Sequence, residues 1–193
     1  MCHAPSEVTT QRLVLRRLAV ADAAALHEAA AQCLQELIYR FPNEVPMLAS
    51  PEGAASYVEQ VTTNWITGAY LEYGIFEQGE RLIGDIALEC EQASRQFDAS
   101  LWLRPSARRK GYASEALSAV MSMAFDTLGG RLVEMGIDPD NDACLALANR
   151  LGFSSLPTLE EEGYFPGTRE GRRLQFGMTR DRWDNRRAGR QGG

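Results

Sequence analysis

The chain has 193 residues, which is enough for one well-buried core and too few for two comfortable domains. Hydrophobic residues make up 45% of it and charged residues 24%, a balance typical of a folded globular protein. No apolar run approaches the ~20 residues that cross a membrane, and the start lacks the basic and apolar segments of a secretory signal. We therefore expect a cytoplasmic protein with no membrane partner.

Net charge and cysteine content limit which partners and metal sites we expect. The net charge is −6, whereas surfaces that bind nucleic acid are usually basic, so we expect no nucleic-acid partner and favour a cationic one. The sequence has no CxxC pair and only two histidines, so we expect no metal site and free thiols. The residues concerned are Cys2, Cys33, Cys90, Cys144, His3 and His27.

The first half of the chain predicts a strand, two helices and then a run of strands. A strand is expected over residues 12–18, followed by a helix that opens at Asp22. Ser50-Pro51 is a good helix start, because Ser caps the helix and Pro fits its first turn, and Gly68 ends it. The buried stripe of the first helix should be Leu26, Ala30, Leu34 and Leu37. Short turns then separate three strands of an antiparallel meander: Tyr70–Glu77, Arg81–Glu91 and Gln96–Leu103.

The second half alternates helices and strands. A basic loop leads into a helix that opens at Gly111 and runs through Leu128. Without an internal repeat or linker, the sequence predicts one α+β domain over residues 1–183. Residues 184–193 are polar and rich in Gly and Arg, so they should form a disordered tail. The other expected elements are a strand over 131–137, a helix over 141–151, a strand around Phe153 and a last strand over 172–180.

The loop before the long helix carries the clearest chemistry. The first backbone N–H groups of a helix lack internal partners and lie at the positive end of its dipole, so they form an anion site. Gly111 lets the backbone approach an anion, and Ala113 keeps the surface small. Arg108, Arg109 and Lys110 add positive charge. This design suits a pyrophosphate, and the alternative is a solvated basic turn before an ordinary helix.

Several segments occur in an order that matches one enzyme family. Arg108-x-x-Gly111-x-Ala113 has the spacing R/Q-x-x-G-x-G/A, and Asn141 opens a segment that ends in Gly152-Phe153. Arg12-Leu13-Val14-Leu15-Arg16, Asp22-Ala23, Leu82-Ile83-Gly84 and the closing residues 178–183 complete the set. Together they resemble the GNAT superfamily of N-acetyltransferases, in its ribosomal-protein N-terminal acetyltransferase-like branch. The resemblance implies a GNAT fold, in which helices flank both faces of a central, mostly antiparallel mixed sheet.

The resemblance also implies acetyl-CoA as co-substrate, and dimers are common among relatives, so a homodimer is one expectation. The pyrophosphate should lie on the basic loop, and the pantetheine arm should lie beside Arg104. The backbone N–H of Leu103 should face the acetyl carbonyl, and Asn141 should bond a pantetheine amide. The residues implied to bind acetyl-CoA are Leu103, Arg104, Arg108, Arg109, Lys110, Gly111, Tyr112, Ala113, Ser114, Asn141 and Cys144.

Two residues are candidates for proton transfer. Asp98 shares a strand face with Ser100 and Trp102, and it could deprotonate the acceptor amine, alone or through a water. A free Asp has a pKa of about 3.9, so burial would have to raise that value; otherwise Asp98 only orients a cationic substrate. Cys144 stands where the branch often has Ser, a suggested proton donor to the departing thiolate. We favour the alternative, in which Cys144 only packs beside pantetheine.

The acceptor side should involve aromatic and acidic side chains. Trp65, Tyr70 and Tyr73 lie near the region that covers the acceptor cleft in relatives, although a Trp on a helical stripe is more often a core residue. Glu161 belongs to an acidic loop that builds the acceptor side in relatives, with a solvated loop as the alternative. If Asp98 is not the base, Asp85 or a carboxylate of the loop from Glu160 to Glu162 is the next candidate. The expected acceptor residues are Trp65, Tyr73, Asp85, Asp98 and Glu161.

The identity of the acceptor stays open. A small cationic amine, such as an aminoglycoside-type antibiotic, fits the acidic balance of the chain, whereas the N-terminus of a protein such as a ribosomal protein fits the branch. An α-amino group, with a pKa of about 7.7–8.0, loses its proton far more readily than a lysine at about 10.4. A non-catalytic acetyl-CoA sensor is a third hypothesis, because a pyrophosphate loop alone does not exclude it.

Overall fold

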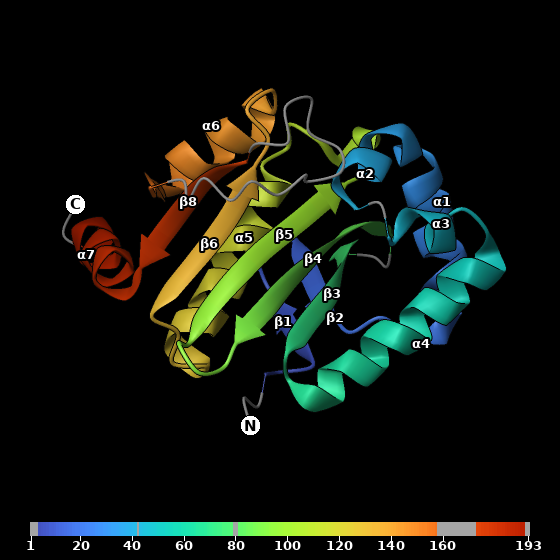
Figure 1. Ribbon diagram of the computed structural model, residues 1–193, viewed down its shortest axis with the longest axis horizontal. Coiled ribbons are helices and arrows are strands. Elements are labelled where there is room, and N and C mark those ends of the chain that lie inside the picture. The colour runs from blue at the N-terminus through green and yellow to red at the C-terminus, as the bar shows by residue number, and fades with distance from the viewer. Residues whose placement is uncertain (1–3, 42, 79–80, 158–172, 192–193) are drawn as a thin grey trace.

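The computed structural model describes residues 4–41, 43–78, 81–157 and 173–191. Its centre is an eight-stranded sheet in the order β1-β2-β3-β4-β5-β6-β8-β7 (Figure 1). Neighbouring strands are antiparallel except β5 and β6, which run parallel. The strands are β1 (Glu7–Thr9), β2 (Leu13–Arg16), β3 (Tyr70–Glu77), β4 (Leu82–Glu91), β5 (Gln96–Leu103), β6 (Leu132–Ile137), β7 (Ser154–Ser155) and β8 (Leu174–Thr179).

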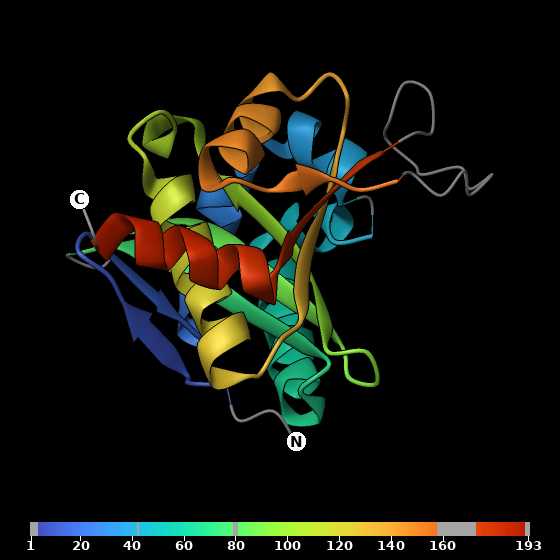
Figure 2. The same ribbon diagram turned by 90° about the vertical axis from the view of Figure 1, so that its left-hand side faces the viewer.

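Helices cover both faces of this sheet (Figures 1 and 2). One core lies between the sheet and α5, α6 and α7, and the other lies between the opposite face and α1 to α4. The α+β arrangement expected from the sequence is therefore confirmed. The helices are α1 (Ala23–Ala31), α2 (Leu34–Arg40), α3 (Val45–Leu48), α4 (Pro51–Thr67), α5 (Tyr112–Ser122), α6 (Asp142–Leu151) and α7 (Arg180–Gln191), with 3₁₀ turns η1 (Val20–Asp22) and η2 (Pro105–Ala107) and a π-helical segment η3 (Met123–Thr127) that continues α5.

The first helical region differs from its prediction. A single helix with a stripe from Leu26 to Leu37 is expected, but the chain leaves helical geometry at Cys33, where φ is −142°, and α1 and α2 are separate. Leu26, Ala30 and Leu37 of the expected stripe are still buried, and Leu34 is partly buried. The break turns α2 so that Glu36 meets Arg108 of the loop before α5, a contact that no local pattern encodes.

The C-terminal segment also differs from its prediction. The expected disordered tail from residue 184 is wrong for the residues up to Gln191, because α7 extends that far. Trp183 anchors this helix: its ring is buried and stacks on Phe125 with 5.7 Å between centroids. Arg180 adds an i,i+4 ion pair with Asp184 at 3.0 Å. Across the described residues, no helix combines the length and the apolar character needed to cross a membrane.

Candidate active site

The site begins where two strands separate. The parallel pairing of β5 with β6 joins Gln96–Asp98 to Leu132–Glu134 and goes no further. On its other side, β5 stays paired with β4 up to Leu103. Among the described residues, β5 therefore has no strand partner on the β6 side beyond Asp98, and a gap opens there.

Backbone N–H groups of β5 point into this gap. The N–H of Arg104 donates to the carbonyl of Ile83 at 2.8 Å, on the β4 side. Successive N–H groups of an antiparallel strand alternate in direction, so those of Leu103 and Leu101 point away from β4. Both residues line the cleft described next. Leu103 was expected here from the sequence; Leu101 was missed, although the same alternation would have identified it.

A cleft of about 840 Å³ lies between the end of β5 and the first turns of α5 and α6. This volume falls in the range of small-molecule and cofactor sites. Nine of the eleven residues predicted to bind acetyl-CoA line it: Leu103, Arg108, Arg109, Gly111, Tyr112, Ala113, Ser114, Asn141 and Cys144. Sequence reasoning missed other lining residues that only the fold brings here, among them Glu36, Leu37, Asp142, Leu147 and Arg150.

Gly111 caps the start of α5 in a left-handed conformation. Its φ is +84°, a region that costs little only for glycine. The N–H groups of the first turn of α5 lack helical acceptors, and Tyr112, Ala113 and Ser114 of this turn line the cleft. The turn can therefore donate to an anion, as a pyrophosphate requires. Arg109 also has a positive φ of 60°, so the loop holds two left-handed residues.

Charged side chains hold this loop in place. Arg108 Nε donates to the carbonyl of Leu103 at 2.9 Å, and its Nη1 lies 2.9 Å from Glu36 Oε2. Glu115 accepts from Thr10 Oγ1 at 2.6 Å and from Arg12 Nε at 2.7 Å. Desolvation alone would raise the pKa of Glu115, but these hydrogen bonds lower it below its usual value. The carboxylate is therefore ionised and structural, and it ties the first turn of α5 to the β1–β2 turn.

Two predicted acetyl-CoA residues lie elsewhere. The Arg104 side chain is buried on the far side of β5, where its Nη2 lies 2.9 Å from Glu28 of α1. The ion pair with Glu28 and a hydrogen bond to Gln32 Oε1 at 3.2 Å hold this side chain away from the cleft, so the prediction that it flanks pantetheine is wrong for the side chain. Lys110 is exposed and is not among the residues that line the cleft. Its carbonyl accepts from Arg12 Nη1 at 2.8 Å, which secures the loop instead.

Asn141 and Cys144 meet at the start of α6. Asn141 caps this helix, since its Oδ1 accepts from the backbone N–H of Cys144 at 3.3 Å. Its amide NH₂ group is left to donate to a pantetheine carbonyl, so Asn141 can have two roles, of which the helix cap was not expected from the sequence. Cys144 is half-buried and lines both the cleft and a neighbouring hollow of about 80 Å³ that contains Asp98. The fold thus brings together the two residues predicted to transfer protons.

Asp98 lies at the last paired position before the strands separate. Desolvation raises its pKa to about 6, with further contributions from the carboxylates of Glu89 and Glu134 and an opposing one from Arg173. Its side chain nevertheless stays accessible to solvent. A carboxylate with this pKa is ionised at neutral pH yet basic enough to accept a proton. The raised pKa that a general base requires therefore comes first from desolvation and then from neighbouring negative charge.

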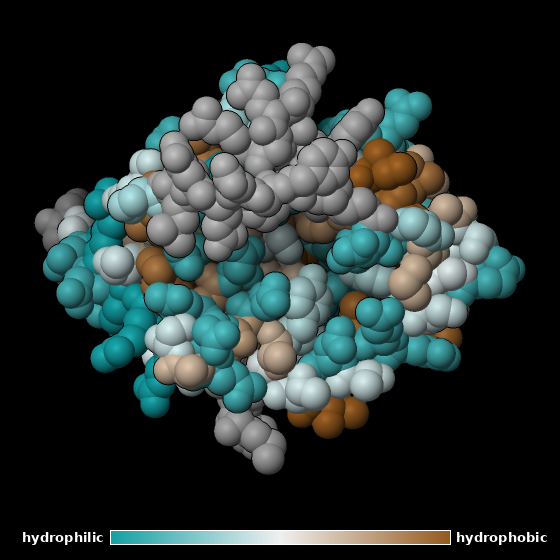
Figure 3. All heavy atoms as spheres, in the orientation of Figure 1, coloured by the Kyte–Doolittle hydropathy of each residue, from teal (hydrophilic) through white to brown (hydrophobic). Residues whose placement is uncertain are grey.

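Several carboxyl groups share the face of the sheet that carries Asp98. Strand alternation and register place Glu72, Asp85, Glu89, Asp98 and Glu134 on this face, which we call the acidic face. Figure 3, drawn from the same side as Figure 1, shows hydrophilic residues gathered over the strands. Asp85 is only 6% exposed, and this burial raises its pKa to about 7. The negative charge of Glu44 also raises the pKa, whereas a hydrogen bond from Trp102 lowers it.

Two of the predicted aromatic acceptor residues, Trp65 and Tyr73, lie outside this face, whereas Tyr70 lies on it. Tyr73 is fully buried, and its hydroxyl donates to the carbonyl of Pro5 and to Met123 Sδ of η3, so the prediction that it lines the acceptor pocket is wrong. Trp65 donates from Nε1 to the carbonyl of Glu72 at 2.8 Å and packs on Tyr73, so it lies partly buried against the core. Glu161 lies outside the described residues.

Comparison with known proteins identifies the family. Residues 12–154 match the family model described as an acetyltransferase (GNAT) domain. The chain belongs to the GNAT acetyltransferase family. It is an acetyl-CoA-dependent N-acetyltransferase, as the resemblance implied. Among the described residues, no group of three or more side chains is arranged to hold a metal ion.

Relatives share this fold along almost their whole length. The chain is 27% identical over 161 residues to the uncharacterized N-acetyltransferase YoaA of Bacillus subtilis, covering 82% of this chain and 89% of that protein. It superposes on a putative ribosomal-protein-serine acetyltransferase from Vibrio cholerae with a TM-score of 0.76 and 24% identity, over 90% of this chain and 97% of that one. The chain also superposes on the microcin C7 self-immunity acetyltransferase MccE, solved with acetyl-CoA and AMP. The TM-score is 0.79 and the identity 16%, over 92% of this chain and 98% of that one.

Proposed function

We propose that this GNAT enzyme acetylates the primary amine of a small cationic acceptor. The observation that carries the proposal is the acidic face, whose carboxylates Glu89, Asp98 and Glu134 lie side by side at the point where β5 and β6 separate. Among the described residues that line the hollow at this point, Arg173 is the single basic residue. A cationic amine would be attracted to this face and oriented toward the cleft.

The residues around the gap can be assigned roles in the transfer. Bound acetyl-CoA supplies a thioester carbonyl carbon as the electrophile. The N–H of Leu103, directed into the gap, donates to the carbonyl oxygen as negative charge develops on it. Asp98 accepts the proton of the amine, directly or through a water, while the new C–N bond forms and the C–S bond breaks. The first turn of α5 holds the pyrophosphate throughout.

Cys144 is expected to contribute little to the chemistry. Replacing Cys144 by Ala should lower kcat by less than about tenfold, because a thiolate is stable enough to leave without a proton donor. Replacing it by Ser should be nearly neutral, since Ser keeps a small donor at this position. Steady-state kinetics with a good amine acceptor measures both effects. A Cys144→Ala enzyme with no detectable turnover, but with normal acetyl-CoA affinity, would instead make Cys144 the proton donor.

A protein N-terminus is the second candidate acceptor. It is favoured by the likeness to structures such as the putative ribosomal-protein-serine acetyltransferase. An α-amino group has a pKa of about 7.7–8.0, so it loses its proton readily near neutral pH. Asp98, with its pKa raised to about 6, could accept a proton from this α-amino group as readily as from a small amine. The acidic face would then attract a basic N-terminal peptide.

An acceptor panel separates the two candidates. Release of free coenzyme A is measured with small cationic amines, with neutral amines and with peptides whose α-amino group is free. We expect the highest kcat/KM with small polycationic amines, because the acidic face lowers their free energy at the site. Acetylated peptide with no small amine turned over would support the protein substrate. Hydrolysis of acetyl-CoA at the same low rate with every acceptor would overturn both.

A further inference from the structure

The acetyl-CoA cleft contains a carboxylate where phosphate groups are expected to bind. Among its described lining residues, Arg108, Arg109 and Arg150 are basic, whereas Glu36 and Asp142 are acidic. Of the two acidic residues, Glu36 is the one that makes an ion pair in the described part of the chain, and its partner is Arg108. A carboxylate in such a cleft raises the free energy of a bound anion, because like charges repel. Glu36 therefore competes with the phosphates for the positive charge of the cleft.

Both carboxylate oxygens of Glu36 contact Arg108. Nη1 of Arg108 lies 3.1 Å from Oε1 and 2.9 Å from Oε2 of Glu36. The arginine side chain is 37% exposed and the glutamate side chain 58% exposed, so water screens the pair and its strength is that of a surface ion pair. A pyrophosphate carries more negative charge than one carboxylate, so it can displace Glu36 from the guanidinium. Meanwhile Nε of Arg108, which donates to the carbonyl of Leu103 at 2.9 Å, keeps the guanidinium at the cleft.

The contacts of Arg108 also restrain α2. This helix has only seven residues, and Cys33 gives its first turn no side-chain cap. A helix this short is marginal in isolation, so its position depends on contacts with the rest of the fold. Burial raises the pKa of Cys33 to about 11, and a hydrogen bond with Arg108 opposes this rise. Arg108 therefore connects the loop before α5 both to Glu36 and to the break between α1 and α2.

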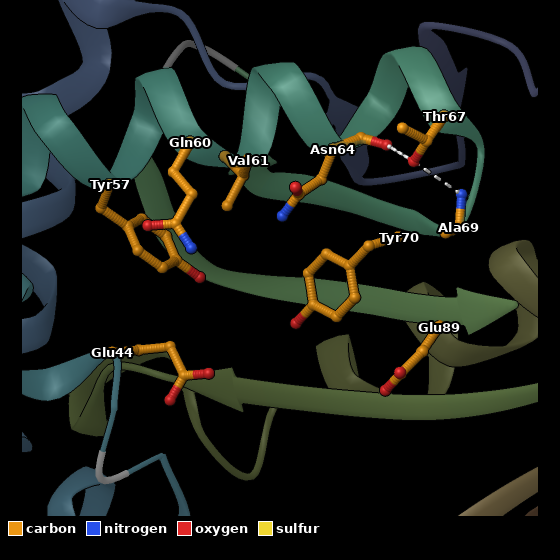
Figure 4. A pocket seen from close by; sticks show the side chains of 9 residues that line it. All are labelled: Glu44, Tyr57, Gln60, Val61, Asn64, Thr67, Ala69, Tyr70 and Glu89. Carbon is orange, nitrogen blue, oxygen red and sulfur yellow. Dashed lines mark hydrogen bonds between the residues drawn. The ribbon is translucent and has the colours of Figure 1, made fainter.

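The residues that α2 positions line both sides of the reaction site. Leu37 lines the acetyl-CoA cleft and a small cavity of about 10 Å³. Phe41, the residue after the helix, lines the same small cavity and also the hollow that contains Asp98. Farther along the chain, Glu44 lines a pocket of about 310 Å³, where it lies opposite the side chains of α4 (Figure 4). A change in the position of α2 would therefore reach the acidic face as well as the cofactor.

We propose that Glu36 is a built-in competitor of the cofactor, which occupies Arg108 in the unliganded enzyme and is displaced when acetyl-CoA binds. The phosphates take over the guanidinium, Glu36 turns to solvent, and α2 loses the ion pair that restrains it. The greater freedom of α2 extends to Leu37 and Phe41, so occupancy of the cofactor cleft alters the acceptor side. This device goes beyond the proposed function, because it operates whichever amine is acetylated.

The sign of one affinity change tests the competition. Glu36→Gln should strengthen acetyl-CoA binding by about fivefold, because no ion pair has to be broken and no carboxylate repels the phosphates. Calorimetric titration of the native and variant enzymes with acetyl-CoA measures this change. If Glu36 instead holds Arg108 ready for the phosphates, the same variant should bind acetyl-CoA more weakly. Weaker or equal binding in Glu36→Gln would overturn the proposal.

A matched variant and a change of salt separate this effect from overall charge and from packing. Glu59 is an exposed carboxylate on α4 that does not line the cleft, so Glu59→Gln should leave acetyl-CoA affinity unchanged. The advantage of Glu36→Gln over the native enzyme should shrink at about 1 M salt, where charges are screened beyond about 3 Å. Equal gains of affinity in Glu59→Gln and Glu36→Gln would attribute the change to net charge and overturn the proposal. A gain that does not depend on salt would attribute it to packing, with the same consequence.

Backbone hydrogen exchange tests the release of α2. In the native enzyme and in Glu59→Gln, the amides of α2 should exchange faster with acetyl-CoA bound than without it, because the cofactor removes the restraint. In Glu36→Gln, exchange should already be fast in the unliganded enzyme and should change little when acetyl-CoA binds. Slower or unchanged exchange of α2 in the native enzyme on binding would overturn the release. Neither measurement needs an acceptor, so failure of this inference is distinguishable from failure of the proposed function.

Discussion

Replacing Asp98 by Asn is expected to lower kcat by about 10²–10⁴-fold while leaving acetyl-CoA affinity nearly intact. The reason is that Asn keeps the shape of the side chain but cannot accept the proton of the amine. Asp98 lies at the last position where β5 pairs with β6, and it does not line the acetyl-CoA cleft. Its replacement should therefore leave acetyl-CoA binding intact. Steady-state kinetics for kcat and a direct titration for acetyl-CoA measure the two quantities separately. A raised acceptor KM with unchanged kcat would mean that Asp98 only orients the amine.

The pH dependence gives this prediction a signature that a structural role would lack. A base works in its ionised form, and the pKa of Asp98 is raised to about 6, so kcat of the native enzyme should rise with pH through about 6 and then level off. This limb should disappear in Asp98→Asn. Glu134→Gln is a matched control: Glu134 raises the pKa of Asp98, so its neutralisation should move the limb to lower pH without abolishing activity.

The acetyl-CoA side of the site could be predicted from the sequence because its signals are local. Gly111 at the start of a helix, with a small residue two positions on, encodes an anion site within a single turn. Asn141 likewise lies at a helix start, and the sequence places it beside Cys144 whatever the rest of the fold does. Such features depend on spacing of a few residues, so they survive without knowledge of tertiary contacts.

The acceptor side could not be predicted in the same way because it depends on register. Tyr70 and Tyr73 are three residues apart on one strand, so they face opposite sides of the sheet. Both were expected near the acceptor cleft, and Tyr73 was expected to bind the acceptor; Tyr73 is instead a core residue, whereas Tyr70 lines a pocket beside α4. Arg104 illustrates the same limit, since its partner Glu28 lies on a helix far away in sequence. Residues that meet through pairing of distant segments carry no local pattern to read.

The largest loss of cofactor binding is expected from Gly111→Asp. Gly111 has φ of +84°, and its backbone opens the anion site of α5, so the change introduces both backbone strain and a like charge beside the pyrophosphate. We expect acetyl-CoA affinity to fall by at least about 100-fold, as several kilocalories per mole of lost hydrogen bonding and added repulsion would produce. Arg109→Ala should cost fivefold or less, because one solvent-screened charge is worth at most about 1 kcal/mol.

Gly111→Asn isolates the cause of that loss. Asn has the shape of Asp and tolerates a left-handed conformation better than most residues, but it carries no charge. A Cβ at this position would meet Arg12 Nη2 at 3.3 Å, the end of a flexible side chain that can shift, so folding should survive in both variants. Calorimetric titration with acetyl-CoA should therefore rank affinities as native, then Arg109→Ala, then Gly111→Asn, then Gly111→Asp. Equal affinities in the Asn and Asp variants would mean that the phosphates do not approach Gly111, and the pyrophosphate would then have to lie elsewhere in the cleft.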